Sequence, residues 1–285
     1  MTTRSTCRVE MSLAILAVSW TAAPSAAQDF RGTELNEVMA KIEQMRHEGK
    51  PIPSSPQLPD GHPDLGDAAG SWFGPTVGDM SGHGLGTSSN VPGGPPGEAM
   101  PEGVVDVPFL PWAKKAFDER QATIAKDDPD ASCLPPGIPR TNAIAFPFQI
   151  YQLPDRIIIL YEKLNVWRIV WMDGRKHTPP DKLNPSFYGE SVGRWEGDTL
   201  VIDVVGQNDL SWVDSAGHPK TEKIHVVERW RRPNQQILHY EANIDDPGAY
   251  SKPWTTSWNM LFKPGAELLD YICVNNPDPQ HMVGK

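Results

Sequence analysis

Three absences set the first limits on this 285-residue sequence. It has only 3 cysteines, it has no excess of positive charge, and no apolar run reaches the length of a membrane span. A net charge of −10 repels phosphate backbones and anionic lipid, so we expect neither a nucleic-acid partner nor membrane insertion. The sequence contains neither the H-E-x-x-H nor the C-x-x-C spacing, and we therefore expect no metal and no other cofactor.

The longest apolar run lies close to the N-terminus. Arg4 and Arg8 precede an apolar region at Met11–Ala22, and small residues follow at Ser25–Ala27. This order is typical of a secretory signal peptide, and the run is too short to remain as a membrane helix. We therefore expect residues 1–27 to be removed from a periplasmic or secreted protein.

Two cysteines remain after that cleavage, Cys133 and Cys273. In an oxidising compartment such a pair usually forms a disulfide. Closing so long a loop stabilises a protein by roughly 4–5 kcal/mol in the chain-entropy model. We predict a bridge that ties the entry of the β region to its last strand; the alternative is two buried free thiols.

The first half of the chain holds most of the 29 prolines and is expected to be less regular. Residues 33–48 and 110–126 have the apolar spacing of amphipathic helices. Residues 50–108 between them are rich in Pro, Gly and Ser, which is typical of irregular structure. The expected organisation is a helical and Pro/Gly-rich N-terminal arm over residues 28–130 and an antiparallel β-barrel domain over residues 131–285.

Strands joined by short turns dominate the chain from about residue 143 onward. In Gly189–Gly206, the turn Glu196-Gly197-Asp198 separates two β-prone runs, as in a hairpin. Short turns predict antiparallel pairing, and the lack of helix-length inserts excludes βαβ units. Consecutive antiparallel strands in this number close best as a barrel or a sandwich. The expected strands are Ala145–Gln152, Arg156–Glu162, Val166–Met172, Glu190–Glu196, Thr199–Val205, Lys223–Arg231, Gln236–Asp245, Thr255–Lys263 and Glu267–Val274.

Glu228 is the first candidate for a functional side chain. Alternation places it on the same face of its strand as Val226 and Trp230, which are apolar. Burial would raise the pKa of this carboxyl or require a cationic partner, and such a perturbed group is a mark of functional sites. The structural alternative is an ion pair with one of three nearby arginines: Arg194, Arg229 or Arg231.

Other charged residues also interrupt the apolar strands. Asp203 is predicted to point inward, and Arg194 lies in the strand that pairs with it. Glu162 is expected to oppose Arg168 across a hairpin. That pair would be either a weak salt bridge at the rim or an acid–cation pair at the mouth of a barrel.

Histidines provide candidates for a general base near neutral pH. His218 follows Asp214 by four residues in a polar loop near a barrel end, and His177 lies in a Pro-rich loop. His225 and His239 lie on paired strands and form the alternative metal pair.

The segment Gly189-Glu190-Ser191-Val192-Gly193 matches the G-x-S-x-G pattern of serine hydrolases. That motif requires a strand before the serine and a helix after it. Here the sequence continues as strand and turn, so we expect Ser191 to lie within a strand and not to act as a nucleophile.

Several motifs resemble an uncharacterised family of secreted bacterial proteins. They are Phe146–Ile150, Asp173–Arg175, Gly193–Asp203 and Asp246–Tyr250, and the resemblance covers about residues 130–276. It implies a lipocalin-like (calycin-like) β-barrel. Gly70-Ser71-Trp72 is similar to the first-strand signature of such barrels, in which the Trp plugs one end.

The sequence has 10 tryptophans and 6 tyrosines, which suggests an aromatic pocket, with core filling as the alternative. Barrels of about eight strands hold one small ligand. The expected pocket residues are Tyr161, Trp167, Trp171, Trp195, Trp230, Tyr240 and Trp258.

The leading functional hypothesis is a secreted, cofactor-independent lyase or isomerase acting on a small aromatic or apolar molecule. Glu228 or Asp203 would transfer a proton, and Arg168 or Arg194 would stabilise the oxyanion. The alternatives are a periplasmic lipocalin-like binding protein without catalysis and an envelope protein. An enzyme predicts a polar cluster deep in the barrel, whereas a carrier predicts polarity only at the rim.

Overall fold

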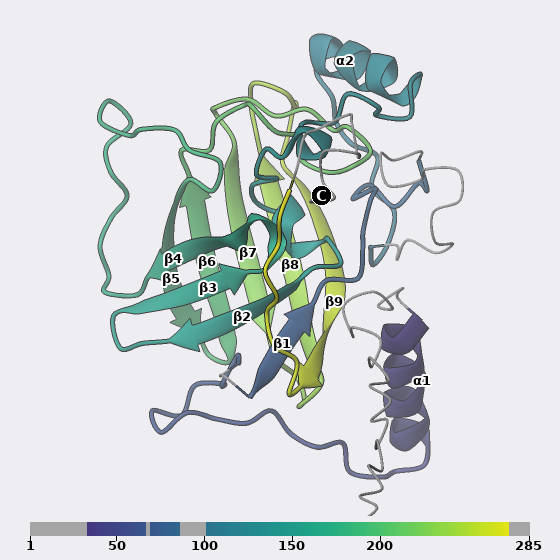
Figure 1. The fold of residues 1–285 in the computed structure, drawn as a ribbon, viewed down its shortest axis with the longest axis vertical. Helices are drawn as coiled ribbons and strands as arrows, with labels where there is room; N and C mark the ends of the chain where they lie inside the picture. Colours follow the sequence, from purple (N-terminus) through teal and green to yellow (C-terminus); the bar gives the residue numbers. More distant parts are fainter. Residues whose placement is uncertain (1–32, 67–68, 86–100, 274–285) are drawn as a thin grey trace, which may run out of the picture.

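The computed structural model describes residues 33–66, 69–85 and 101–273, so the predicted signal peptide lies outside the described residues. Within this part of the chain, nine strands follow one another around a closed barrel, and the last pairs with the first (Figure 1). The strands are β1 (Gly70–Phe73), β2 (Pro147–Gln152), β3 (Arg156–Tyr161), β4 (Val166–Trp171), β5 (Glu190–Glu196), β6 (Thr199–Val205), β7 (His225–Arg231), β8 (Ile237–Asp245) and β9 (Trp254–Pro264).

The period-2 pattern of the sequence correctly gives the two faces of β3. In β3 the buried residues are Ile157, Ile159 and Tyr161, and the residues between them are partly exposed. Large aromatic side chains fill the interior of the barrel, which is therefore a packed core and not an open ligand cavity. The largest of them are Trp72, Phe148, Trp230, Tyr240 and Trp258.

The prediction of an all-antiparallel sheet is wrong at one position. β4 and β5 run parallel and are paired only at Val170 with Ser191 and at Trp171 with Val192. The connection over residues 172–189 is long enough to return along the barrel before β5 begins, which a short hairpin turn could not do. The two strands therefore diverge beyond this short contact.

The first and last strands of the sheet differ from the predicted list of strands. Gly70–Phe73 forms β1, and Trp72 is fully buried, with its Nε1 donating to the Leu65 carbonyl at 2.5 Å. The strand predicted over residues 267–274 is not formed by residues 267–273, and Val274 lies outside the described residues. Both edges of β9 are already paired, with β8 and β1, so no edge remains for a further strand.

Among the described residues, two α-helices lie outside the barrel. α1 (Thr33–His47) packs beside β9, where Leu35 is buried in a small cluster with Phe73 and Leu261 (Figure 1). α2 (Pro111–Gln121) ends before the predicted residue 126, because the chain turns with positive φ at Ile124 and Ala125. None of the described helices combines the length and apolar character needed to cross a membrane. Short 3₁₀ helices occupy Pro129–Ser132, Arg140–Asn142 and Lys163–Asn165.

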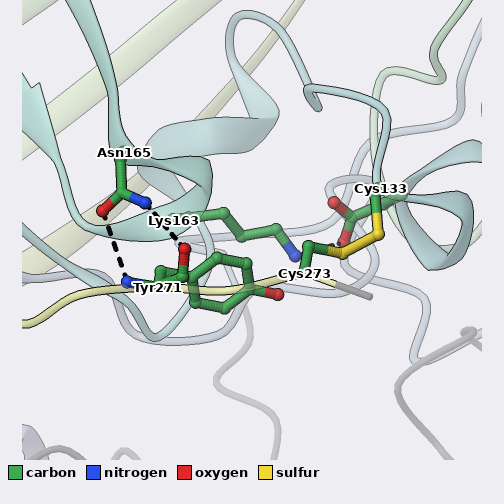
Figure 2. Close-up of a disulfide and its surroundings, with 6 residues drawn as sticks. Cys133, Lys163, Asn165, Tyr271 and Cys273 are labelled. Carbon is green, nitrogen blue, oxygen red and sulfur yellow. Dashed lines mark hydrogen bonds and ion pairs between the residues drawn. A yellow bond between two sulfur atoms is a disulfide. The ribbon is translucent and has the colours of Figure 1, made fainter. Parts of the chain in front are cut away.

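The predicted disulfide is present between Cys133 and Cys273, whose Cα atoms are 5.7 Å apart. Cys273 follows the last strand and does not lie in it, which corrects the expected attachment. It ends the C-terminal strap, residues 265–273, which returns along the barrel from the end of β9. Figure 2 shows Asn165 bonded to the Tyr271 backbone, with Nδ2 donating to the carbonyl at 2.7 Å.

Candidate functional site

An ion pair lies inside the barrel between Arg168 of β4 and Glu228 of β7. Nη2 of the arginine donates to Oε2 of the glutamate. Glu228 is completely buried and Arg168 is 3% exposed. The predicted partners of Glu228 are wrong. Successive residues of β7 point to opposite faces, so Arg229 and Arg231 point outward whereas Glu228 points inward.

Three donors surround the Glu228 carboxylate. Besides Arg168, Asn142 Nδ2 donates to Oε1 at 3.0 Å and the Tyr240 hydroxyl at 2.9 Å. Tyr161 donates its hydroxyl to Asn142 Oδ1 at 3.0 Å and so extends the same network. Burial raises the pKa of both tyrosines, which therefore remain protonated donors. Both carboxylate oxygens of Glu228 therefore accept hydrogen bonds from buried donors.

The guanidinium of Arg168 has fewer of its hydrogen-bond donors in use. Its Nε donates to Ser191 Oγ at 2.9 Å. Its Nη1 has no hydrogen-bond partner among residues 33–66, 69–85 and 101–273. Burial opposes the charge, but the nearby Glu228 outweighs it and raises the pKa of Arg168, so the guanidinium stays charged. The result is an electroneutral buried pair with one unused donor.

A cleft of about 490 Å³ lies outside this pair, where β4 and β5 diverge. Arg168 and Ser191 belong both to the cleft and to the buried network. Tyr188 lines the cleft and reaches inward, with its ring 6.0 Å from that of Tyr161. Burial raises the pKa of Tyr188 to about 12. We call this feature the seam cleft, and its lining is Trp167, Arg168, Ile169, Trp171, Ser186, Tyr188, Gly189, Glu190 and Ser191.

Two of the predicted interior charges lie outside the barrel. Asp203 Oδ1 lies 2.9 Å from Nε2 of both His177 and His225, on the outer face of β6. Arg194 is 57% exposed and pairs with Glu196. Their inward assignment is therefore wrong, because the inward positions of β6 are taken by apolar residues such as Ile202.

Glu162 does not face Arg168. The register places Arg168 opposite Ile159, since β3 ends at Tyr161 and the 3₁₀ turn follows. Glu162 is buried and instead accepts a hydrogen bond from the Leu269 backbone at 2.8 Å. Burial raises its pKa. The role of Glu162 in the structure is to hold the C-terminal strap.

His218 lies in a buried cluster at the barrel end that faces α2. Its Nδ1 is 2.7 Å from Asp214 Oδ2, and its ring stacks on Phe117. Donor atoms of Asp79, Asp214 and His218 lie within 4.8 Å of one another, which suits a metal ion. However, the carboxylate oxygens already accept backbone N–H groups, including that of Met80. We assign this cluster to anchoring the arm segment around Met80.

The alternative metal pair, His225 and His239, does not come together in the structure. His225 opposes Asp245 and His239 opposes Arg231, at the two ends of the β7–β8 hairpin. The expectation that paired strands bring these two rings together is wrong, because their register separates them along the strands.

The predicted pocket aromatics fall into two groups. Tyr161, Trp230, Tyr240 and Trp258 fill the barrel interior. Trp171 lines the seam cleft with Trp167, which is 65% exposed and not the interior residue that we expected. Trp195 stacks on His62 at 4.7 Å and lines a second pocket of about 530 Å³, at the barrel end covered by the arm.

Sequence reasoning missed several residues of the site. Asn142 and Tyr188 lie outside the strands, where no periodicity marks them. Ser191 is noticeable only through a motif of a different function. Lys220 is buried, with Nζ donating to Gln207 Oε1 at 3.2 Å, and burial lowers its pKa to about 7. A lysine that follows a proline in a polar loop gives no signal of this kind in the sequence.

Fold and site together define a closed nine-stranded β-barrel with a charged pair in its interior. The architecture is compatible with a calycin-like barrel. Comparison of the chain with protein-family models, curated proteins and solved structures finds no match.

Proposed function

We propose that the protein binds a small molecule in the seam cleft and directs an acceptor oxygen of that molecule toward Arg168. The observation that carries the proposal is the unpartnered Nη1 of this buried arginine, which belongs to a residue lining the cleft. A buried donor without an acceptor costs free energy, and such groups require an explanation. A bound ligand would supply the missing acceptor.

The buried pair itself supports a functional role. A buried ion pair is often no more stabilising than apolar residues of the same size, so stability alone does not explain its presence. Since Glu228 compensates the charge of Arg168, the ligand needs an acceptor but no net negative charge. A carbonyl or hydroxyl oxygen therefore suits the site.

The rest of the cleft supports an aromatic or apolar body for the ligand. Trp167, Ile169 and Trp171 lie along one side, and flat aromatic surface is typical of small-molecule sites. Its volume of about 490 Å³ is in the range of such sites.

We place this activity outside the cytoplasm, in the periplasm or the medium, as for a lipocalin-like carrier. The disulfide supports an oxidising compartment. The negative charge of the chain makes nucleic acid and anionic membranes poor partners.

Filling the cleft tests this function. Ile169→Trp adds bulk on the outer face of β4, and we expect loss of any small molecule that co-purifies with the protein from its native compartment, as measured by native mass spectrometry. The matched control is Ile158→Trp, because Ile158 pairs with Ile169 across the sheet but does not line the cleft. Equal retention of the molecule by both variants would contradict binding in the seam cleft.

A second candidate is a cofactor-independent lyase or isomerase, supported by the polar cluster deep in the barrel. In this case Arg168 would stabilise an oxyanion and Glu228 would transfer a proton, after one of its three donors moves away. Once a substrate is known, we expect Glu228→Gln to lose turnover and keep binding, measured at a temperature where both proteins are folded. Unchanged turnover would remove Glu228 from the mechanism.

A further inference from the structure

One histidine fastens the connection between β4 and β5 to the barrel. His177 Nδ1 lies 2.9 Å from Glu190 Oε1, and its Nε2 lies 2.9 Å from Asp203 Oδ1. The next residue, Thr178, donates its backbone N–H and its hydroxyl to Glu190, each at 2.7 Å. Residues 177–178 are therefore attached to β5 and β6 through two carboxylates.

The hydrogen bonds of this contact depend on the protonation form of the imidazole ring. A neutral imidazole has one N–H and one acceptor nitrogen, whereas both partners of His177 are carboxylates, which only accept when ionised. Only the imidazolium form donates to both. A neutral ring would place a lone pair against one of the carboxylates, and imidazoles as a class change charge between about pH 5 and 8.

Several other charged groups surround the contact. His225 of β7 also lies against Asp203 Oδ1, and this hydrogen bond lowers the pKa of Asp203 and raises that of His225. Burial opposes ionisation of Glu190, but the bonds from Thr178 and His177 lower its pKa. The other nearby charges are Asp245 beside His225, and Arg175 and Asp173 on the connection itself.

The sign follows from these directions. A raised His225 pKa stabilises the folded arrangement at low pH and loses this effect as the pH rises through the folded value. A lowered Asp203 pKa stabilises it above the unfolded value and loses this effect at strongly acid pH. Both effects stabilise the Asp203–His225 pair, which holds Asp203 beside His177, in mildly acid solution.

The remainder of the connection has a separate anchor. The Ser186 backbone N–H donates to the Gly206 carbonyl at 3.0 Å, and Asn208 donates to the Ser186 carbonyl at 2.8 Å. Release of His177 would thus loosen the first part of the connection, residues 174–183, which Thr178 would still attach to Glu190, and leave Ser186 in place. Glu190, which lines the seam cleft, would lose its bond to His177 at the same time and keep those from Thr178.

We propose that His177 is a pH-sensitive latch: its imidazolium holds residues 174–183 against Glu190 and Asp203, and its deprotonation loosens this segment and changes the wall of the seam cleft. The latch regulates the site of the proposed function and rests on it for its biological meaning. The segment can nevertheless be measured without any ligand.

Hydrogen exchange read by mass spectrometry tests the latch on the ligand-free, full-length protein. We expect protection factors of residues 174–183 to fall about tenfold or more between pH 5.5 and pH 8.5, after correction for the intrinsic rate, because charge-assisted hydrogen bonds are lost. Peptides from β7 and β8 should keep their protection. His177→Gln should give the unprotected segment at both pH values.

The matched control is His239→Gln, which removes a histidine on β8 that contacts Asn259 and not the connection. It should behave as the wild type does. Equal protection of residues 174–183 at both pH values in the wild type, or full protection in His177→Gln at pH 5.5, would overturn the latch. Neither result depends on ligand binding, so failure of the latch and failure of the proposed function are separate outcomes.

Discussion

Glu228→Gln is expected to lower the free energy of unfolding by about 3–5 kcal/mol, because it leaves Arg168 as an uncompensated buried cation. Arg168 is 3% exposed and its charge is balanced by this one carboxylate in the barrel interior. Asn142 and Tyr240 both donate to the Glu228 carboxylate, and a glutamine amide would replace one acceptor by a donor. The effect therefore combines a lost charge pair with a mismatched network.

Urea unfolding at neutral pH measures this loss, and a double-mutant cycle with Arg168→Met isolates the pair. We expect the double variant to be no less stable than either single one, since it removes both charges together. The exposed pair of Arg194 and Glu196 gives the control: Glu196→Gln should cost under about 1 kcal/mol. A cost this small for Glu228→Gln would contradict the buried charge pair.

The same pair shows what a sequence can and cannot give. The burial of Glu228 follows from alternation within β7, which is a local property of the chain. Its partner depends on how nine strands close, since Arg168 lies three strands away from β7 around the barrel. The arginines adjacent in sequence were expected as partners, yet Arg229 and Arg231 point outward by the very alternation that turns Glu228 inward.

The seam cleft lies between β4 and β5, the two strands whose parallel pairing the sequence did not predict. Every described pair of neighbouring strands is antiparallel except β4 and β5. The connection over residues 172–189 contains no helix, so it lacks the usual mark of a parallel crossover. The cleft and the His177 contact both arise from this connection, and neither could be inferred from strand periodicity.

Asp203 illustrates a second limit. Alternation assigns it to one face with Val201 and Val205 but does not say which face points into the barrel. Val201 is completely buried although it shares the outward face with Asp203. Apolar neighbours therefore do not identify the inner face where outer residues are covered as well.

Removing the disulfide is expected to have an effect as large as breaking the buried pair. Cys133 and Cys273 are separated by 140 residues, and the chain-entropy model gives about 5 kcal/mol for a loop of this length. The bridge closes a loop that contains β2 to β9, so its loss increases the freedom of most of the unfolded chain. The double variant Cys133→Ser/Cys273→Ser avoids a free thiol, and its urea unfolding should match that of the reduced wild type.

The native C-terminal strap should respond differently from the barrel. Noncovalent contacts of the strap include the Tyr271 bonds to Asn165 and the Leu269 bond to Glu162, while Ile272 is 81% exposed. We therefore expect hydrogen exchange of residues 267–273 to accelerate by local opening in the double variant, whereas exchange of the strands accelerates only as far as the loss of global stability requires. A loss of stability below about 2 kcal/mol would contradict the chain-entropy account of the bridge.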